Sequence, residues 1–317
     1  MFRIVVVIPC FRVADSVCDV IKAMDDGVAC VICVDDGCPD NSGDVIEKRF
    51  HEDPRVVVIR HDRNRGVGAA MVTGYRAALE RDADVIVKVD GDGQMDPRQI
   101  DRLISPILAG DADYAKGNRF FDPQTIGGMP ITRVLGNAGQ SFLAKISTGY
   151  WSVFDPANGF TAIHAKVARY IPFEKLHNRY FFETDLLFRL NTIRAVVVDV
   201  PMSAIYGSEV SNLNILHSLL TFPFLHARNF SKRFVYSYLI RDFNIATVNV
   251  LIGVPLLIFG IVFGLQQWRD SIHEDVFASA GTVMLAALPI IVGTQLVLSF
   301  IAHDISNQPS DPLHRRL

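Results

Sequence analysis

Two long stretches without a charged side chain, residues 243–268 and 276–302, constrain the fold of this chain more than any other feature. Each is longer than the roughly 20 apolar residues that a helix needs to cross a bilayer. Pro255 and Pro289 lie inside them, and membrane helices tolerate such prolines. A helical hairpin buried in protein is the alternative, but two successive apolar spans favour the membrane. We therefore expect residues 243–302 to form a transmembrane hairpin.

The charges around this hairpin predict its orientation. Residues 211–242 alternate leucines with polar residues and interleave basic and aromatic side chains, which is typical of a helix in a membrane interface. The connecting segment 269–275 has one base and three acids, whereas Arg315 and Arg316 lie in the tail 303–317. The positive-inside bias then places both termini in the cytoplasm. A helix packed on a folded domain is the alternative for residues 211–242.

Before residue 211 the chain alternates apolar, strand-like runs with helix-like segments. The runs are nearly continuous and rich in β-branched residues, as in a parallel sheet covered by helices on both faces. The predicted strands are residues 3–9, 29–34, 56–59, 85–89, 114–119 and 195–200. We therefore expect an α/β domain over residues 1–210, with a mostly parallel, Rossmann-like sheet. Ligands bind such sheets beyond the carboxyl ends of the strands.

The predicted strand 85–89 ends in a turn that carries two carboxylates, Asp90 and Asp92. Acidic groups one residue apart repel each other, which favours a divalent cation between them and a polyphosphate. Carboxylate oxygens are the ligands that hard ions such as Mg²⁺ and Mn²⁺ prefer. An ordinary acidic turn is the alternative, because Asp-Gly pairs are common in turns.

Composition limits the classes of function. The net charge of −3 gives no electrostatic reason to expect nucleic acid binding. All five cysteines lie within the first 38 residues, and no second Cys or His pair follows at zinc-finger spacing. We interpret them as buried thiols of a reducing compartment. The amino-terminal apolar run is too short to be a signal peptide.

Several short motifs then occur in a recognisable order. They are IPCFR at 8–12, VDDGCPDNSGD at 34–44, RNRGVGAA at 63–70 and VDGDGQMDP at 89–97. This series resembles the family 2 glycosyltransferases with a GT-A fold. The motifs GNR at 117–119, TR at 132–133 and DPANGF at 155–160, with the two C-terminal spans, resemble the polyprenyl-phosphate branch of that family. That branch includes dolichyl-phosphate mannose synthase and bacterial undecaprenyl-phosphate glucosyltransferases.

The resemblance implies a nucleotide site made of Pro9, Phe11, Asp36, Arg65, Gly68 and Asp90. A carboxylate such as Asp36 can accept a base N–H, and an aromatic ring can cover the flat base. The glycine lets the nucleotide approach the backbone. Val13 stands where the family usually has an acidic residue, so the identity of the base is left open.

For the chemistry, the resemblance implies that Asp90, Asp92 and Gln94 surround Mg²⁺ or Mn²⁺ and the diphosphate, with Asp92 counted among the catalytic residues. It also implies that Arg119 and Arg133 bind the phosphate of a lipid acceptor, since a guanidinium group suits phosphate oxygens. A solvated surface charge is the alternative for either arginine.

Asp155 is the residue that the resemblance implies as a base or as a group that orients the acceptor. A strong base is not obligatory, because a phosphate monoester is largely dianionic at neutral pH. Asp155 capping the turn before Pro156 is the alternative. Glu183 and Asp185 are the other candidates for assisting the acceptor. The histidines interpreted as structural are His164, His177 and His217.

Together these features predict an inverting, metal-dependent glycosyltransferase. It would move one sugar from a nucleotide sugar to polyprenyl phosphate at the cytoplasmic face of a bilayer, as in the bacterial inner membrane. Transfer to the hydroxyl of a saccharide or lipid-linked oligosaccharide is an alternative, and a non-catalytic membrane assembly subunit is another. Members of the family form tetramers, so the resemblance also implies a homo-oligomer.

Overall fold

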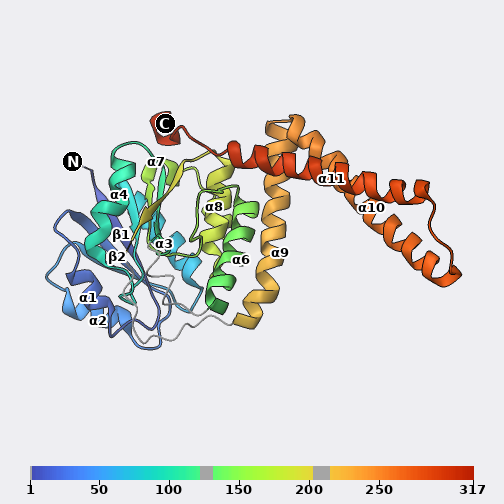
Figure 1. Ribbon diagram of the computed structural model, residues 1–317. Coiled ribbons are helices and arrows are strands. Elements are labelled where there is room, and N and C mark those ends of the chain that lie inside the picture. Colours follow the sequence, from blue (N-terminus) through green and yellow to red (C-terminus); the bar gives the residue numbers. More distant parts are fainter. Residues whose placement is uncertain (1, 122–130, 203–214) are drawn as a thin grey trace. The chain divides into compact units, whose positions relative to one another are not determined.

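The computed structural model describes residues 2–121, 131–202 and 215–317, with the side chains of 131–135 and 215–220 outside this description. It divides into two compact units (Figure 1). The sheet unit comprises Met1–Phe230 and Pro309–Leu317, and the hairpin unit comprises Ser231–Gln308. Each unit is described by itself below.

A seven-stranded sheet forms the centre of the sheet unit, in the order β3-β2-β1-β4-β6-β5-β7. Its strands are β1 Ile4–Cys10, β2 Val28–Asp35, β3 Val56–Arg60, β4 Val85–Lys88, β5 Tyr114–Asn118, β6 Thr161–His164 and β7 Val197–Pro201. β6 runs antiparallel to its neighbours β4 and β5, and the other pairings are parallel. The mostly parallel sheet predicted from the sequence is confirmed.

Helices cover both faces of this sheet because each central strand is apolar on both sides. Along β1, Val5 and Val7 point into one buried cluster, whereas Val6 and Ile8 point into the other. This alternation follows from the two-residue period of a strand. Side chains that are apolar on both faces are what a doubly covered parallel sheet requires.

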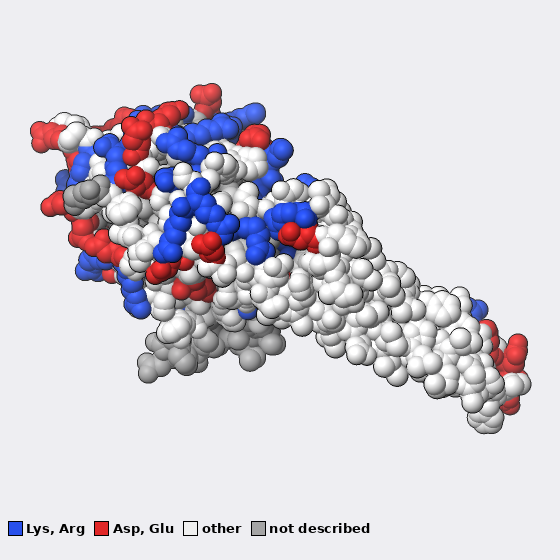
Figure 2. Space-filling view, turned by 90° about the horizontal axis from the view of Figure 1, so that it is seen from above, with Lys and Arg blue, Asp and Glu red and all other residues white. Residues whose placement is uncertain are grey.

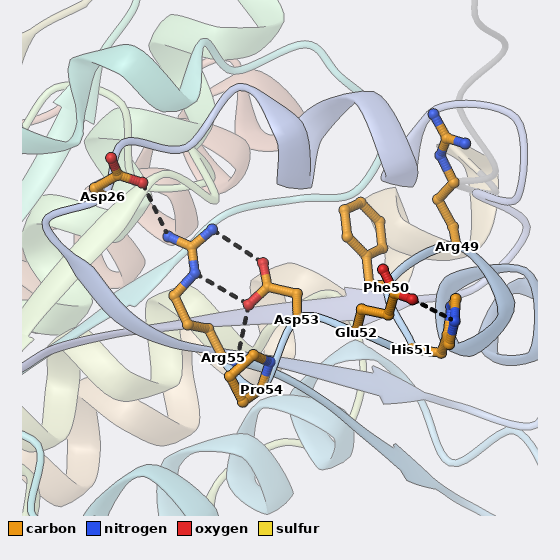
Figure 3. Close-up of a pocket in the computed structure, with 8 residues that line it drawn as sticks. All are labelled: Asp26, Arg49, Phe50, His51, Glu52, Asp53, Pro54 and Arg55. Atoms are coloured by element: carbon orange, nitrogen blue, oxygen red, sulfur yellow. Dashed lines mark hydrogen bonds and ion pairs between the residues drawn. The ribbon is translucent and has the colours of Figure 1, made fainter.

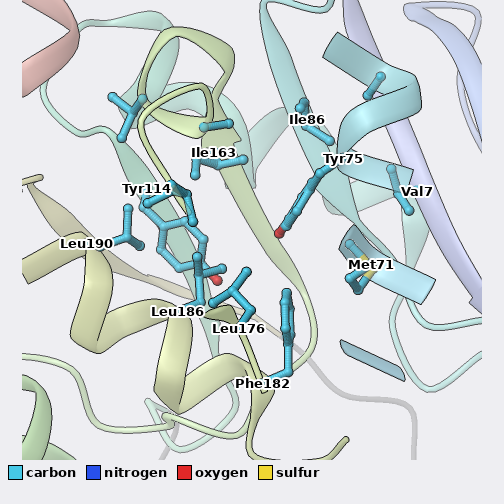
Figure 4. Close-up of a cluster of buried hydrophobic side chains, with 14 of the residues drawn as sticks. Val7, Met71, Tyr75, Ile86, Tyr114, Ile163, Leu176, Phe182, Leu186 and Leu190 are labelled. Atoms are coloured by element: carbon cyan, nitrogen blue, oxygen red, sulfur yellow. The ribbon is translucent and has the colours of Figure 1, made fainter. Parts of the chain in front are cut away.

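On the first face lie α3 (Val67–Leu79), α7 (Ala165–Ala168) and α8 (Phe182–Thr192). Figure 4 shows Met71 and Tyr75 from α3 and Phe182 and Leu186 from α8 in one cluster with side chains of the sheet. Gly74 lets α3 approach β1 closely, because a Cβ at that position would overlap the side chain of Val7. Packing on this face fixes the position of the first turn of α8, which contains Glu183.

On the second face lie α1 (Val17–Lys22), α2 (Ser42–Arg49), the short 3-10 turn η1 (Pro97–Gln99) and α4 (Ile100–Leu108). Their buried apolar residues include Val20, Ile46 and Leu103. Asp96 begins η1 as its cap, since its side chain accepts a hydrogen bond from the backbone N–H of Arg98. The cap fixes the point at which the turn after β4 ends and η1 begins.

The strand β6 is not among the strands predicted from the sequence. It has only four residues, Thr161–His164, and so gives no detectable alternation. Its pairing places Thr161 opposite Lys88, at the carboxyl end of β4. The segment 155–160, which precedes β6, is thereby brought to the same edge of the sheet as the turn after β4.

The carboxyl-terminal segment returns to the opposite edge of the sheet unit. Asp113, just before β5, accepts hydrogen bonds from the backbone N–H groups of Leu313 and His314, each at 2.8 Å, and from that of Val196 at 2.7 Å. The ring of His314 lies 2.7 Å from the same carboxylate and stacks on His164 at 4.4 Å between centroids. Residues Pro309–Leu317 of the tail are therefore an integral part of the sheet unit.

The hairpin unit contains a π-helix, η3 (Val235–Arg241), and two long helices, α10 (Ile245–Glu274) and α11 (Ala280–Ser306). Both long helices are long and apolar enough to cross a membrane. Gly253 packs closely against α11, and Gly293 packs closely against α10. In Figure 2 the hairpin is almost free of charged side chains along its length and carries them at its tip.

That tip differs from the expected connecting loop 269–275. α10 continues through the charged residues to Glu274, and Asp275 then ends it in a left-handed conformation. At the other end of the hairpin, Arg233 and Asp304 form a buried ion pair at 2.6 and 2.9 Å. Asp304 also accepts a hydrogen bond from the hydroxyl group of Tyr238 at 2.5 Å. The helix α9 (Ile215–Phe234) contains the boundary between the two units.

Candidate active site

The predicted site residues gather at one edge of the sheet because of its topology. Asp36, Asp90 and Arg119 follow the carboxyl ends of β2, β4 and β5, which point the same way. β6 is antiparallel, so the segment 155–160 that precedes it lies at this edge as well. This edge is where a doubly wound sheet binds its ligands.

The turn after β4 is held from several sides. The carboxylate of Asp92 accepts a hydrogen bond from the backbone N–H of Gln94 at 3.0 Å. The hydroxyl group of Ser16 donates to the carbonyl oxygen of Gly91 at 2.7 Å. Both acidic side chains are partly exposed, and that of Asp90 has 28% of its surface accessible. The turn is thus fixed while its carboxylates stay reachable for a ligand.

Lys88, a residue that the sequence interpretation missed, lies directly beneath this turn. Its ammonium group is 2.9 Å from Asp90 Oδ1 and 2.8 Å from Glu183 Oε1, and its side chain is only 2% exposed. Burial alone would lower the pKa of Lys88, but the two carboxylates raise it above its usual range. A lysine inside an otherwise apolar strand, two positions before an aspartate, was the available signal.

The segment 155–160 packs directly against this group of charges. A Cβ at Gly159 would overlap Asp90 Oδ2 and the ammonium group of Lys88, so only glycine fits there. Asn158 holds the segment in place, because its side chain donates to the carbonyl oxygen of Gly117 at 2.7 Å and accepts from Phe160 N–H at 2.9 Å. The two motifs therefore form one site.

Arg119 and Asp155 are partners in this site. Nε and Nη2 of the arginine lie 2.8 and 3.1 Å from the two carboxylate oxygens, a two-bonded geometry. Asp155 is buried and Arg119 is partly exposed. The structure thus brings together two of the residues expected to act on the acceptor. The side chain of Arg133, in α6 (Ile131–Thr148), lies outside the described residues.

Two further ionisable groups interact with Asp155: Lys116, which is fully buried, and Asp199, which is partly buried. Burial lowers the pKa of Lys116 to about 8, although nearby Asp155 and Glu183 act in the opposite direction. Burial raises the pKa of Asp199 to about 6, although the hydrogen bond from the Phe154 backbone lowers it. Both groups titrate near neutral pH, so the electrostatic environment of Asp155 changes there.

Asp36 shapes the loop that precedes α3. Its carboxylate accepts hydrogen bonds from the backbone N–H groups of Arg65 at 2.9 Å and Gly66 at 2.7 Å, and lies 2.7 Å from Nδ1 of His61. The neighbouring Asp35 accepts from the N–H groups of Cys38 and Gly43 in the same way. Asp36 is therefore engaged within the protein, and its expected contact with a base stays a prediction.

The other residues expected at the nucleotide lie on the same edge or close to it. Pro9 is in β1, and Phe11 follows that strand with its ring 5.5 Å from the guanidinium group of Arg12. The side chain of Arg65 is exposed. Gly68 has a packing role, because a Cβ there would overlap the backbone of residues 177–178. Its expected contact with a nucleotide also stays a prediction.

The remaining candidates for assisting the acceptor are bound inside the protein. Glu183 is paired with Lys88, as described above. Asp185 accepts hydrogen bonds from the His177 backbone and the Asn229 side chain, each at 3.0 Å. A carboxylate bound in this way is a poor candidate for taking a proton from an acceptor.

A divalent cation fits the donors that this edge offers. Among the residues that the structure describes, no group of three or more His, Cys, Asp and Glu side chains converges on one point. The protein would therefore supply the oxygens of Asp90, Asp92 and Gln94, and substrate phosphates would supply others. This sharing is usual for Mg²⁺ at phosphate sites.

A surface hollow of about 460 Å³ lies away from this site (Figure 3). It is lined by Asp26, by residues 49–53 and by Pro54 and Arg55. Asp26 precedes β2 and Arg55 precedes β3, so the hollow is at the amino ends of these strands. It plays no part in the arrangement described above.

The fold and the site define a glycosyltransferase of the GT-A type. The solved structure of glucosyl-3-phosphoglycerate synthase from Mycobacterium tuberculosis shares the fold, with a TM-score of 0.55 and 18% identity over 73% of this chain and 78% of that chain. The model of the family described as glycosyl transferase family 2 matches residues 5–171, which is more than half of the chain. The chain therefore belongs to glycosyl transferase family 2, as the motifs predict.

Two curated relatives are similar to more than half of the chain. The undecaprenyl-phosphate mannosyltransferase of Micrococcus luteus is 30% identical over 204 residues, which are 63% of this chain and 83% of the relative. The UDP-N-acetylglucosamine–dolichyl-phosphate N-acetylglucosaminyltransferase of Methanococcus voltae is 30% identical over 188 residues, which are 56% of this chain and 74% of the relative. Both names match the polyprenyl-phosphate branch that the motifs resemble.

Proposed function

We propose that this protein is an inverting, metal-dependent glycosyltransferase that moves a single sugar from a nucleotide sugar to a polyprenyl phosphate. The relatives named for transfer to undecaprenyl and dolichyl phosphate support this acceptor. The observation that carries the proposal is the packing of Gly159 against Asp90 and Lys88. It joins the segment 155–160, whose Asp155 is bonded to Arg119, to the turn that contains the paired carboxylates.

In this proposal the acceptor supplies its own nucleophile. An oxygen of the phosphate dianion attacks the anomeric carbon, the bond from that carbon to the diphosphate oxygen breaks, and the nucleoside diphosphate leaves with the electron pair. Attack from the opposite face inverts the anomeric centre. The dianion needs positioning more than deprotonation, which suits the arginines Arg119 and Arg133. Asp155 then serves to hold the Arg119 guanidinium group in place.

Asp90, Asp92 and Gln94 are the proposed holders of Mg²⁺ or Mn²⁺ and the diphosphate. The ion would neutralise negative charge that develops on the departing diphosphate. The solved M. tuberculosis synthase contains Mn²⁺ and UDP, which supports a divalent ion in this fold. The nucleoside is proposed to lie against Pro9, Phe11, Asp36, Arg65 and Gly68.

For the membrane, we propose that α10 and α11 span a bilayer, with an interfacial segment 211–242, a hairpin 243–302 and a tail 303–317. The tail and residues 1–210 lie on the same, cytoplasmic side in this proposal. Two observations support it: both helices are long and apolar enough to span, and the tail binds Asp113 of the sheet unit. We also propose that this bilayer is a bacterial inner membrane and that the protein forms a homo-oligomer.

The proposal is tested with purified full-length protein in detergent. The protein, Mn²⁺ or Mg²⁺, undecaprenyl phosphate and a panel of nucleotide sugars are incubated, and the lipid products are analysed by mass. We expect one donor to give undecaprenyl phosphate carrying one sugar. Transfer only to a saccharide or lipid-linked oligosaccharide, with no competition by free undecaprenyl phosphate, would contradict the proposed acceptor. Absence of nucleotide binding would favour a non-catalytic subunit.

A further inference from the structure

The carboxylate of Asp90 is linked to α8 by a buried lysine. The ammonium group of Lys88 lies between Asp90 Oδ1 at 2.9 Å and Glu183 Oε1 at 2.8 Å. Glu183 lies in the first turn of α8, and its side chain is 9% exposed. The two carboxylates are thus held by one cation, although 95 positions separate Lys88 from Glu183 along the chain.

This arrangement leaves a defined charge at the edge of the sheet. Lys88 contributes one positive charge, and Asp90, Asp92 and Glu183 contribute three negative charges, so the four groups together carry two negative charges. A net charge of that size matches a divalent cation. Without Glu183, the lysine would neutralise Asp90 directly, and less negative charge would face the cation.

The arrangement also fixes where Asp90 points. Gly159 lies against Oδ2 of Asp90 and against the ammonium group, so there is no room for Asp90 to turn towards Gly159. The pairing of β4 with β1 and β6 fixes the backbone of Lys88, whereas its ammonium group is held by Asp90 and Glu183. The position of Asp90 therefore depends on Lys88, and that of Lys88 depends on Glu183.

We propose that Glu183 is a positioning residue, which acts through Lys88 to set the orientation of Asp90 and the negative charge that Asp90 offers to a metal-bound diphosphate. This inference rests on the proposed function. Groups that hold a metal ligand from behind typically change metal affinity by about 10- to 100-fold when they are removed. Glu183 is thereby assigned a role other than that of a base for the acceptor.

The test measures binding of Mn²⁺ to the full-length protein, by electron paramagnetic resonance of the free ion, with and without a nucleoside diphosphate. Glu183→Gln keeps the shape of the side chain but removes its charge. We expect it to weaken Mn²⁺ binding by roughly tenfold or more. Turnover should recover to within a few fold of the wild type at saturating Mn²⁺. Glu183→Asp, which keeps the charge, should bind Mn²⁺ more tightly than Glu183→Gln.

Asp185→Asn is the matched control. Asp185 is buried two positions further along α8, and its carboxylate contacts His177, Arg189 and Asn229 rather than Lys88. Its substitution should lower the melting temperature without changing the dissociation constant for Mn²⁺. If Glu183→Gln does not fold, the dissociation constants for Mn²⁺ of Glu183→Asp and Asp185→Asn are compared instead. Weaker binding in Glu183→Asp than in Asp185→Asn supports the inference, and equal binding contradicts it.

An unchanged Mn²⁺ constant in Glu183→Gln, with turnover lost at every Mn²⁺ concentration, would overturn the inference and make Glu183 a direct participant. Failure of the proposed function would look different. In that case Asp92→Ala would leave Mn²⁺ and nucleotide binding unchanged, whatever Glu183→Gln does.

Discussion

Arg119 and Asp155 form a two-bonded ion pair, with Nε 2.8 Å from Oδ2 and Nη2 3.1 Å from Oδ1 of the carboxylate. From the sequence they are separate candidates, Arg119 for binding a phosphate and Asp155 for acting as a base or for orienting the acceptor. The pairing favours the orienting role for Asp155, because a carboxylate in this geometry fixes the plane of the guanidinium group. A guanidinium group held in this plane is suited to binding an acceptor phosphate.

Substitution Asp155→Asn should therefore weaken acceptor binding rather than abolish chemistry. We expect the KM for polyprenyl phosphate to rise roughly tenfold or more, since a charged hydrogen-bonded pair is lost. Slow hydrolysis of the nucleotide sugar without acceptor should stay unchanged. Steady-state kinetics with varied acceptor measures both. A collapse of kcat with an unchanged KM would instead identify Asp155 as a base.

Gly159→Ala should disable the site without unfolding the protein. The added methyl group would displace Asp90 and Lys88, and a misplacement of about 1 Å can cost about 100-fold in rate. The measurement is kcat/KM for the nucleotide sugar, with circular dichroism to check the fold. Gly27→Ala is the control, because a Cβ at Gly27 meets nothing within 4 Å. Normal activity of Gly159→Ala would refute the close packing of the two motifs.

Asp113→Ala should destabilise the sheet unit and release the tail. The backbone N–H groups of Val196, Leu313 and His314 would lose their acceptor, which should cost on the order of 3 kcal/mol in the free energy of unfolding. Urea unfolding followed by tryptophan fluorescence measures the loss. Asp111→Ala is the control, since its ion pair with Arg315 is exposed and should contribute little. Equal effects of the two substitutions would contradict the docking of the tail.

Two buried histidines predict that acid destabilises the sheet unit. Burial, with a contribution from His314, lowers the pKa of His164 from 6.5 to about 4, and burial lowers the pKa of His226 likewise from 6.5 to about 4. Both stay neutral in the folded protein but charge near pH 6.5 when unfolded, so the unfolded state binds more protons between these values. Stability should fall as the pH falls from 6.5 towards 4.

The check is the free energy of unfolding measured at several pH values for the wild type and for His226→Asn. His226 lies 2.7 Å from the hydroxyl group of Ser147, and asparagine keeps a polar group there without a charge change. The variant should lose less stability between pH 6.5 and 4 than the wild type. If the free energy of unfolding falls equally with pH in the wild type and the variant, His226 is not held neutral by the fold.

The strands with long runs of β-branched residues could be predicted, because burial on both faces leaves a continuous apolar pattern. β6 could not, since four residues give no period and its place between β4 and β5 depends on antiparallel pairing. The carboxylates of Asp90 and Asp92 could be predicted as site residues, because they lie in an acidic turn directly after a recognisable strand. Lys88 was passed over, because the strand was interpreted from its apolar residues alone.

The partners of these residues lie far away in the sequence, which is why spacing could not reveal them. Glu183 meets Lys88 only because α8 packs on the face of the sheet beside β4. Asp113 meets His314 only when the chain returns after α11. Such pairs are determined by packing in three dimensions, and local patterns carry no trace of them.

The most direct test of the central claim compares the wild type with Asp92→Ala in forming a lipid-linked sugar from a nucleotide sugar and polyprenyl phosphate with Mn²⁺. The proposed role of Asp92 predicts a sugar-carrying polyprenyl phosphate from the wild type. It also predicts a loss of at least roughly a thousandfold in the variant, because a metal contribution of several kcal/mol disappears. A variant that folds and still makes this lipid at the wild-type rate would contradict the account.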